Sequence, residues 1–423
     1  MICIYQLRIN HPSNHALNNP SNHALNHLID NTKMCESKEH PIFNSSVSQN
    51  KHCWQLRYTP KSCDLGIQEL NLVLDMETAG WRKYYERRRN EKSVMHRGQA
   101  KLLWSEIEFL TEYSQDGDTV VYAGAAPGTH IKILSDMFPE LKFVLVDPAK
   151  FTVEKTERIS IREKTMFTDE IAQEFAGRND VLFISDIRST DPFVDPKEEN
   201  EKCIKRDMAD QARWHRIMRP RFSIFKFRLP WPDHKNKEYV PITTYFGGSI
   251  YLPIWGPEST TESRLVVARD SEMTKEYNNE QYEGNMFYFN SCTRVARYHH
   301  GYYGESGLDH CFDCAAAVDV LENYCKKRPA IPRFQKTVFD KSGEHIIPMT
   351  IPEMIDRIME TLHQRTFDKP NPDKQKLRAN INKHQLVDGK LPYRVTAGRL
   401  SAGTSPDRVT ESHIPEQTHQ KKY

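Results

Sequence analysis

The chain has 423 residues, a net charge of +2 and a mean hydropathy of −0.71. This length allows two or three domains or one enlarged domain, and the small net charge excludes a chain coated with positive charge for nucleic acid. We find no signal peptide and no apolar run long enough to span a membrane, and the nine cysteines are scattered, so we predict a cytoplasmic protein.

Both ends of the chain are predicted to be disordered. Residues 11–26 contain two near-identical copies of a Pro-Ser-Asn-His-Ala-Leu-Asn tract, which lacks the apolar content to build a core. Met34 is an alternative start within this extension. The chain divides into a disordered extension at 1–50, a main domain at 51–330, an accessory helical segment at 331–365 and a disordered polar tail at 366–423.

A basic and aromatic run precedes the main motifs. Residues 81–92 read Trp-Arg-Lys-Tyr-Tyr-Glu-Arg-Arg-Arg-Asn-Glu-Lys. Basic side chains interleaved with aromatic rings suit a track for an RNA backbone, which we centre on Arg87, Arg88 and Arg89. A solvated basic helix face is the alternative for any one of these residues.

Residues 118–147 predict a βαβ unit that binds a nucleotide-like cofactor. A β-branched strand leads into the turn Gly124-Ala-Ala-Pro-Gly128, a helix follows, and a second strand ends at Asp147. An acid in this place binds ribose hydroxyls. Pro127 removes a backbone donor that a pyrophosphate would use, which favours S-adenosylmethionine over NAD.

Three later charged residues lie in strands or at strand ends. Asp186 follows the apolar strand 180–185, Glu262 opens another strand, and Lys226 interrupts the apolar run 222–229. Burying a lone ammonium is costly, so Lys226 is either paired with carboxylates or made less basic, unless it snorkels to the strand end. Because ligands bind outside the carboxyl ends of the strands in a doubly wound sheet, Asp186 and Lys226 should meet over Gly124.

The C-terminal part of the main domain contains a cysteine-rich helix. His310-Cys311-Phe-Asp-Cys314, with Cys325, suggests a zinc site. However, Cys311, Cys314 and Cys325 share one apolar stripe at helical spacing, which favours buried core thiols. Further on, residues 351–362 predict an amphipathic helix that docks on the body or on a partner.

Five sequence blocks together resemble a known family. They are His96-Arg-Gly-Gln-Ala-Lys101, Val121-Tyr-Ala-Gly-Ala-Ala-Pro-Gly-Thr-His130, Ile184-Ser-Asp-Ile-Arg188, Lys226-Phe-Arg-Leu-Pro-Trp-Pro-Asp233 and Glu262-Ser-Arg-Leu265. In this order they are similar to the poxvirus-type cap-specific mRNA (nucleoside-2'-O-)-methyltransferases, which in poxviruses are also the small subunit of poly(A) polymerase. The resemblance covers roughly residues 54–327. It implies a Rossmann-like S-adenosylmethionine-dependent methyltransferase fold of the α/β class, with a doubly wound central sheet and helices on both faces.

The resemblance implies a catalytic tetrad of Lys101, Asp186, Lys226 and Glu262. A ribose 2'-hydroxyl must lose its proton as it attacks the methyl group, and Lys226 is the expected general base. Desolvation and the second ammonium at Lys101 would make Lys226 less basic. Asp186 and Glu262 would orient it, and the four groups would titrate together.

The same resemblance implies three sets of binding residues. The S-adenosylmethionine pocket comprises Gln99, Tyr122, Gly124, Gly128, His130, Asp147, Thr168 and Asp186. The 7-methylguanine pocket comprises Tyr58, Trp231, Asp233 and Glu283, because a cationic base prefers aromatic faces and carboxylates accept from its edge. Arg188 joins the arginines at 87–89 as an RNA contact. Ala149 stands where the family has a cofactor-binding arginine.

Two functional classes therefore remain open. One is an enzyme that methylates the first transcribed nucleotide of m7G-capped mRNA, and the other is an RNA-binding subunit of a poly(A) polymerase that uses the same fold as a scaffold. An intact tetrad favours the enzyme, and the two can coexist. For a viral member, the cytoplasmic location would be the viral factory or the virion.

Overall fold

A computed structural model describes residues 67–84, 98–190, 196–233, 239–257, 260–302, 308, 311–328, 334–340 and 342–367. The predicted extension at 1–50 and nearly all of the tail at 366–423 lie outside these residues. Both therefore remain predictions. Within the described part of the chain, no helix is long and apolar enough to cross a membrane.

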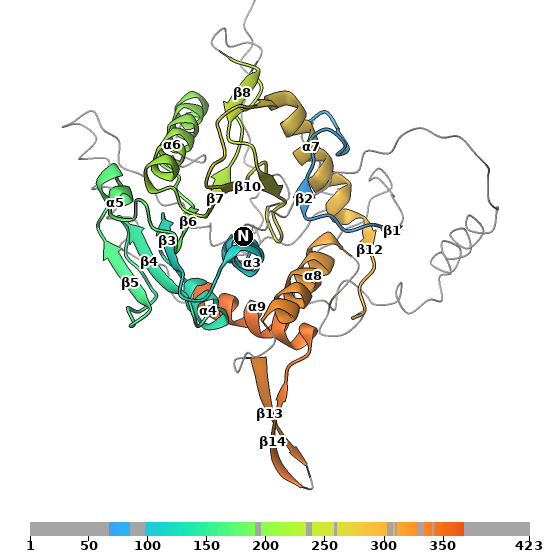
Figure 1. Cartoon of the computed structure of the whole chain (residues 1–423). Helices are drawn as coiled ribbons and strands as arrows, with labels where there is room; N and C mark the ends of the chain where they lie inside the picture. Colours follow the sequence, from blue (N-terminus) through green and yellow to red (C-terminus); the bar gives the residue numbers. More distant parts are fainter. Residues whose placement is uncertain are drawn as a thin grey trace, which may run out of the picture.

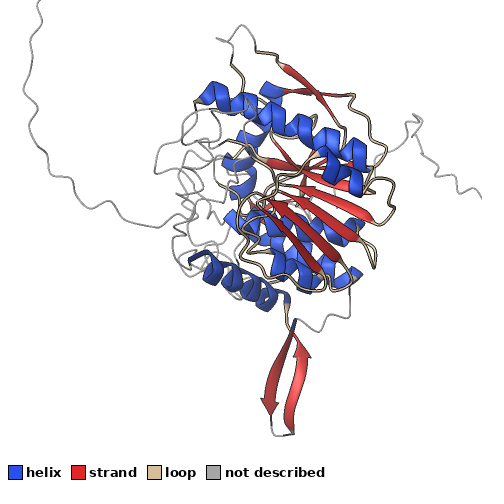
Figure 2. Ribbon diagram, turned by 90° about the vertical axis from the view of Figure 1, so that its left-hand side faces the viewer, coloured by secondary structure: helices blue, strands red, loops and turns tan. Residues whose placement is uncertain are grey.

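An eight-stranded sheet forms the centre of the molecule (Figure 2). In spatial order its strands are β2 (Val73–Leu74), β9 (Ser249–Tyr251), β10 (Ser263–Ala268), β7 (Phe222–Phe227), β6 (Val181–Ser185), β3 (Thr119–Ala123), β4 (Lys142–Asp147) and β5 (Ile159–Glu163). Strands β3 and β6 are buried along their whole length, as expected for strands covered by helices on both faces.

Strand directions bring several chain segments to one edge of the sheet. Strands β5, β4, β3, β6 and β7 are parallel, whereas β10 runs antiparallel to both β7 and β9. The start of β10 therefore lies beside the end of β7, with Ser263 opposite Phe227. The chain switches direction around β3, because β4 lies on one side of it and β6 on the other, and this is where doubly wound sheets bind ligands.

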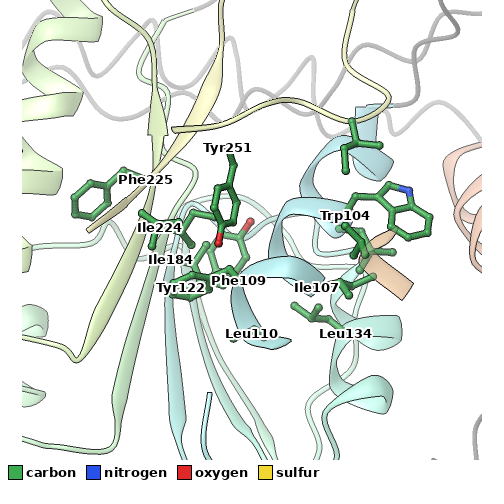
Figure 3. Close-up of a cluster of buried hydrophobic side chains, with 14 of the residues drawn as sticks. Trp104, Ile107, Phe109, Leu110, Tyr122, Leu134, Ile184, Ile224, Phe225 and Tyr251 are labelled. Carbon is green, nitrogen blue, oxygen red and sulfur yellow. The ribbon is translucent and has the colours of Figure 1, made fainter. Parts of the chain in front are cut away.

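Helices cover both faces of the sheet, as predicted (Figures 1 and 2). They are α3 (Gly98–Tyr113), α4 (Ile131–Met137), α5 (Asp169–Glu174), α6 (Lys197–Met218), α7 (Asn279–Ser291), α8 (Phe312–Lys327) and α9 (Ile351–Phe367). Helix α5 packs on α6, while α3 packs on α4, α8 and α9. Figure 3 shows the core on both sides of α3, where Phe109 lies on the side of Tyr122 and Tyr251, and Trp104 and Ile107 lie on the opposite side of the helix.

Smaller elements surround this core. They are the pairs β1 (Ile67–Gln68) with β12 (Arg297–Tyr298), β8 (Ile242–Tyr245) with β11 (Lys275–Asn278), and β13 (Gln335–Asp340) with β14 (Gly343–Pro348), and the 3₁₀ turn η2 (Thr293–Val295). The β13–β14 hairpin projects from the body (Figures 1 and 2). The segment at 331–365 was predicted to be an accessory helical segment, but it contains this hairpin before α9 begins.

Helix α9 docks on the body, which settles one alternative left by the sequence. Its apolar stripe is buried against α8 and α3 and comprises Met354, Ile355, Ile358, Met359 and Leu362. The helix spacing of this stripe was visible in the sequence, whereas its docking surface was not.

The cysteines of α8 pack as the helical stripe predicted. Cys311 and Cys314 are buried free thiols, and the Cys325 thiol lies 3.9 Å from the Met354 sulfur on α9. Cys292, by contrast, is disulfide-bonded. Scattered cysteines therefore do not by themselves require a reducing compartment, and the cytoplasmic location remains a prediction.

Candidate active site

Four charged side chains predicted as a tetrad meet at the carboxyl edge of the sheet. Lys226 Nζ lies 3.0 Å from Asp186 Oδ1 and donates to the Asp186 carbonyl oxygen at 3.1 Å. Lys101 Nζ, from the first turn of α3, pairs with Glu262 Oε1 just before β10. The structure therefore arranges the four residues as two ion pairs from four separate segments.

Arg264 joins the two pairs and was not assigned a role from the sequence. Its Nη2 lies 2.7 Å from Asp186 Oδ1, and its Nη1 lies 3.1 Å from Glu262 Oε1. Arg264 stands directly opposite Lys226 across the β7–β10 ladder, so both side chains leave the same face of the sheet. The available signal was its position two residues after Glu262, since residues two apart on a strand share a face.

Arg188 belongs to the same charge network. Its Nη2 lies 3.5 Å from Glu262 Oε2, and its Nη1 lies 3.7 Å from Asp207 Oδ2 on α6. The residue is buried, and the structure thus places this predicted RNA contact beside the tetrad. The other predicted RNA contacts, the arginines at 87–89, lie outside the described residues.

Burial and neighbouring charges shift the pKa values of the Lys101–Glu262 pair. Burial lowers the pKa of the Lys101 ammonium, against the opposing attraction of Glu262. Burial alone would raise the pKa of Glu262, but the cations Lys101, Lys226, Arg264 and Arg188 hold it well below its usual range. Glu262 is therefore ionised at neutral pH, and the Lys101 proton is easier to remove than that of a solvated lysine.

The glycine turn after β3 lies against the Asp186 backbone. Gly124 has φ +79°, and a Cβ there would lie 2.9 Å from both the Asp186 carbonyl carbon and the Ile187 nitrogen. Gly128 has φ +68° and would bring a Cβ to 3.0 Å from a Val153 methyl carbon. Only glycine fits such positions without strain, so the cofactor turn and Asp186 are built as one unit.

Asp147 holds the glycine turn from the end of β4. Its Oδ2 accepts a hydrogen bond from the Ala126 N–H at 3.0 Å, and its Oδ1 accepts one from the Ala149 N–H at 2.7 Å. Burial raises the pKa of Asp147 to about 7, although both hydrogen bonds oppose that rise. The carboxylate is wholly covered here, and its structural contact is with the turn itself.

Three further predicted cofactor residues meet around Glu106, whose role the sequence did not reveal. The Tyr122 hydroxyl donates to Glu106 Oε1 at 2.6 Å, and His130 Nε2 lies 2.9 Å from Glu106 Oε2. His130 Nδ1 lies 2.8 Å from Gln99 Oε1, which also accepts from the Thr129 hydroxyl at 2.8 Å. Gln99 and Glu106 are seven residues apart on α3 and so share a helix face.

Gln99, Gly124 and Asp186 are the partly exposed members of the predicted cofactor set at this edge. Tyr122, His130 and Asp147 are buried behind them. Thr168, also partly exposed, is the N-cap of α5, where its hydroxyl accepts from the Ile171 N–H at 3.4 Å. A backbone that only glycine can adopt, an acid at the end of β4 and exposed polar groups at the switch point together fit a nucleoside cofactor.

An aromatic cluster lies beside the tetrad. The Tyr84 ring meets the Trp231 ring edge-on, with centroids 5.6 Å apart, and meets Phe287 of α7 at 5.3 Å. Glu283 stands one helical turn before Phe287 on α7, so it shares the helix face that carries this cluster. Trp231, Asp233 and Glu283 are all half-buried. Tyr58, predicted as the second ring, lies outside the described residues, and Tyr84 was not predicted.

Glu201 on α6 fixes the position of Trp231. Its Oε2 accepts from the Trp231 N–H at 3.1 Å, and its Oε1 lies 2.6 Å from Arg228 Nη2. The Arg228 guanidinium lies 5.5 Å from the Trp231 ring centroid. Burial lowers the pKa of Arg228 to about 10, which still leaves it charged at neutral pH. The Trp231 ring already accommodates one cation on its π system.

Residues 72–327 match the family described as "Poly A polymerase regulatory subunit", which is more than half of the chain. The chain belongs to this family. All four tetrad residues, the glycine turn and the aromatic cluster fall inside the match. The β13–β14 hairpin and α9 lie beyond it.

Curated relatives agree with the family match. The chain is 26% identical over 327 residues to the cap-specific mRNA (nucleoside-2'-O-)-methyltransferase of Myxoma virus (strain Lausanne), covering 72% of this chain and 91% of the relative. It is 30% identical over 219 residues to the protein of the same name from Fowlpox virus (strain NVSL), covering 47% and 68%. The resemblance predicted from the five sequence blocks is thereby confirmed.

Among solved structures, a putative ribosomal RNA methyltransferase from Plasmodium falciparum matches with a TM-score of 0.28 and 12% identity. The match covers 43% of this chain and 100% of that one. A likeness at this level carries no argument. The fold class stands instead on the strand order and directions described above, which confirm the predicted doubly wound α/β architecture.

Proposed function

We propose that this family member transfers a methyl group from S-adenosylmethionine to the ribose 2'-hydroxyl of the first transcribed nucleotide of m7G-capped mRNA. The observation that carries the proposal is Lys226, a buried lysine held 3.0 Å from Asp186 at the edge where the glycine turn ends. Burying a charged lysine costs free energy even when, as here, two oxygens of Asp186 accept from it. A role in proton transfer explains why the fold keeps a lysine at this position. The names of the viral relatives support the same reaction.

In this proposal, Lys226 is a neutral amine when the substrate is bound, so that it can accept the proton of the 2'-hydroxyl as its oxygen attacks the methyl group. Asp186 holds the Lys226 amine in place, and Arg264 forms ion pairs with both Asp186 and Glu262. The proton is best regarded as belonging to the coupled group, because Lys101 and Glu262 titrate within the same network. When bound, S-adenosylmethionine would supply an electrophilic methyl group, and Gln99, Gly124 and Asp186 would hold it at the sheet edge.

Cap recognition is assigned to the aromatic cluster. Trp231 would stack on the cationic 7-methylguanine, and Asp233 and Glu283 would accept hydrogen bonds from the base edge. Tyr84 is better supported than Tyr58 as the second ring, because it already contacts Trp231. The 5.6 Å edge-on contact leaves no parallel slot, so Tyr84 would have to turn for a base to enter between the rings.

The experiment that tests this function uses the full chain, labelled S-adenosylmethionine and RNA with an unmethylated first ribose. Label should appear on the 2'-oxygen of the first nucleotide of m7G-capped RNA. A matched RNA with a 2'-deoxy first nucleotide should remain unlabelled, and triphosphate-ended RNA should be a poor substrate. Label on a base, or none on capped RNA, would rule the proposal out.

The second function is the one in the family description, a regulatory subunit of a poly(A) polymerase. It does not require the tetrad, so it is compatible with the enzyme and not an alternative to it. Lys226→Ala separates the two functions, because a tethering role would survive the loss of methyl transfer. Stimulation of a poly(A) polymerase catalytic subunit by both wild type and Lys226→Ala would support the dual role.

A further inference from the structure

A turn between β9 and β10, at residues 255–257, lies beside the Lys101 side chain. A Cβ placed on Gly256 would lie 3.5 Å from Lys101 Cδ, 3.3 Å from Thr260 Cγ2 and 3.2 Å from Pro253 Cβ. A methyl group at Gly256 would therefore be in ordinary van der Waals contact with the lysine stem. The turn at 255–257 thus lies beside this lysine.

A wholly buried ion pair holds this turn from the opposite side. Arg294 of η2 and Asp313 of α8 are both unexposed, with Nη2 and Oδ2 3.0 Å apart. Arg294 Nη2 donates to the Gly256 carbonyl at 2.9 Å and Nη1 donates to the Pro257 carbonyl at 3.1 Å. Asp313 Oδ1 accepts from the Trp255 N–H at 2.7 Å. One pair thus satisfies the backbone polar groups of three consecutive residues.

The turn has a backbone conformation that needs such support. Trp255 has φ +58°, in the left-handed region that residues with a Cβ rarely adopt, and its side chain is completely buried. Strained conformations persist only where the surroundings impose them, and they concentrate at functional sites. A buried ion pair is weak support for stability but strong support for one geometry, because its hydrogen bonds work in one arrangement.

The same ion pair reaches the partner of Lys101. Arg294 Nη1 donates to Asn290 Oδ1 at 3.1 Å, and Asn290 Nδ2 donates to the Thr260 carbonyl at 2.8 Å. The Thr260 hydroxyl in turn accepts from the Glu262 N–H at 3.0 Å. Both members of the Lys101–Glu262 pair are thereby connected to one buried centre.

We propose that Arg294 and Asp313 are positioning residues, which hold the turn at 255–257 against Lys101 and so fix the Lys101–Glu262 pair beside Lys226. The placement of Lys101 is independent of the reaction, whereas its use in methyl transfer rests on the proposed function. The hydrogen bonds of this pair run to the turn at 255–257 and to Asn290, away from the glycine turn and the aromatic cluster. Its disturbance should therefore spare cofactor and cap binding.

Gly256→Ala tests the contact with one methyl group. The added methyl would be tightest against Pro253 and Thr260, and Thr260 holds the Glu262 N–H, so kcat should fall about tenfold through a shift of the Lys101–Glu262 pair. Affinities for S-adenosylhomocysteine and m7GTP, measured by calorimetry, should be unchanged. Gly247→Ala is the matched control, because a Cβ there meets only the Lys275 Cβ, at 3.7 Å.

A second readout follows Lys101 without relying on activity. Reaction of the Lys101 amine with an acylating reagent, followed by mass spectrometry over a pH series, reports when it loses its proton. Glu262, Asp186, Lys226 and Arg264 act on this amine, and burial lowers its pKa. In the double variant Arg294→Met/Asp313→Leu, which removes both buried charges, the turn should loosen and the labelling midpoint should move to higher pH.

The outcomes separate the two proposals. Unchanged kcat and unchanged Lys101 labelling in folded Gly256→Ala would overturn the positioning role, whether or not the double variant folds. Shifted labelling in Gly256→Ala and not in Gly247→Ala would support that role, even if wild type transferred no methyl group. In that last case only the proposed function would fail.

Discussion

At the scale of single residues, the ion pairs of the site fix the position of each charged side chain. Lys226 and Lys101 are separated by the two carboxylates, and Arg264 contacts both carboxylates. This arrangement holds the two lysine side chains close together, with Asp186, Glu262 and Arg264 between them. The two lysines differ in burial, and the Lys226 side chain is the less exposed of the two.

The first prediction concerns Lys226. Lys226→Ala should lower methyl transfer by at least about 100-fold, because general-base catalysis contributes about that much. Binding of S-adenosylhomocysteine should change little, since the Lys226 amine is bonded to Asp186 whereas Asp147 holds the glycine turn. Turnover and calorimetry measure the two effects. Lys275→Ala, at an exposed lysine of β11, is the control, and near-normal turnover of Lys226→Ala would remove this residue from the mechanism.

The second prediction concerns Asp147 and pH. Its pKa is raised from 3.8 to about 7 in the folded protein, so folding favours the protonated acid. The resulting stability is complete below the unfolded pKa and is lost as pH rises from about 4 to about 7, at roughly 1.4 kcal/mol per unit. Asp147→Asn cannot ionise and should show a smaller loss over this window.

Denaturant melts of wild type and Asp147→Asn at several pH values test this prediction. Other buried acids with raised pKa values, such as Asp207 and Asp313, are present in both proteins and cancel in the difference. A difference that is flat from pH 4 to pH 7 would show that Asp147 is ionised in the folded state. The variant should also bind S-adenosylhomocysteine more weakly, because its side chain no longer accepts from both the Ala126 and the Ala149 N–H groups.

At the scale of elements, the sequence predicted those parts whose local pattern is unambiguous. The strands before Gly124, Asp147 and Asp186 are short apolar runs with clear ends, and the structure has β3, β4 and β6 there. Asp186 and Lys226 were expected to meet because parallel strands share a carboxyl edge, and they do. These predictions needed only the hydrophobic pattern of the sequence and the known right-handed connections between parallel strands.

Other features required the three-dimensional register. Arg264 contacts Asp186 only because β10 is inserted antiparallel beside β7, which no local pattern reveals. Glu106 gains its role when Tyr122 and His130 arrive from another segment. Tyr84 contacts Trp231 although almost 150 residues separate them in the sequence. In the hairpin at 335–348, apolar and polar residues alternate too irregularly to distinguish strands from the expected helical segment.

The third prediction contrasts the hairpin with the helix that follows it. Phe339 and Ile346 are 75% and 66% exposed, so the β13–β14 hairpin buries little. Replacing residues 337–346 with a short Gly-Ser linker should change the free energy of unfolding by less than about 0.5 kcal/mol. Ile355→Ala on α9, at a wholly buried position, should cost about 2–5 kcal/mol.

Chemical denaturation of the two variants beside wild type decides this point. The retained base of the hairpin, where Met349 donates to the Phe334 carbonyl, serves to keep α9 correctly attached in the shortened protein. A large loss of stability on hairpin replacement would mean that the exposed side chains pack on something in the folded protein. Equal effects of the two changes would contradict the docking of α9.

At the scale of the whole molecule, the proposed cap pocket is built from segments that are distant in sequence. Tyr84 follows β2, Trp231 follows β7, and Glu283 and Phe287 belong to α7, which lies after β11. The fold brings them together beside the tetrad, since Glu201 fixes Trp231 and α7 carries Asn290, which holds the chain before Glu262. Base recognition and chemistry therefore share structural supports.

The fourth prediction tests this arrangement through Trp231. Methylation makes guanine cationic and its N1 proton more acidic, so an indole and two carboxylates should favour 7-methylguanine. Trp231→Ala should remove most of the difference between m7GTP and GTP affinity, whereas Trp231→Phe should keep much of it. Uncapped RNA, if held through phosphate contacts, should bind the three proteins alike and with steep salt dependence.

Thermal stability measured beside the affinities separates recognition from packing. Trp231 is half-buried and its ring contacts the Arg228 guanidinium and the Tyr84 ring, so Trp231→Ala also costs some stability, although the backbone N–H bond to Glu201 is kept. If it only filled space, Trp231→Ala would lose stability and weaken m7GTP and GTP binding in equal proportion. Equal affinity of the wild type for the two nucleotides would refute the cap pocket even where methyl transfer is observed, and the enzyme would then have to find its target through the RNA chain.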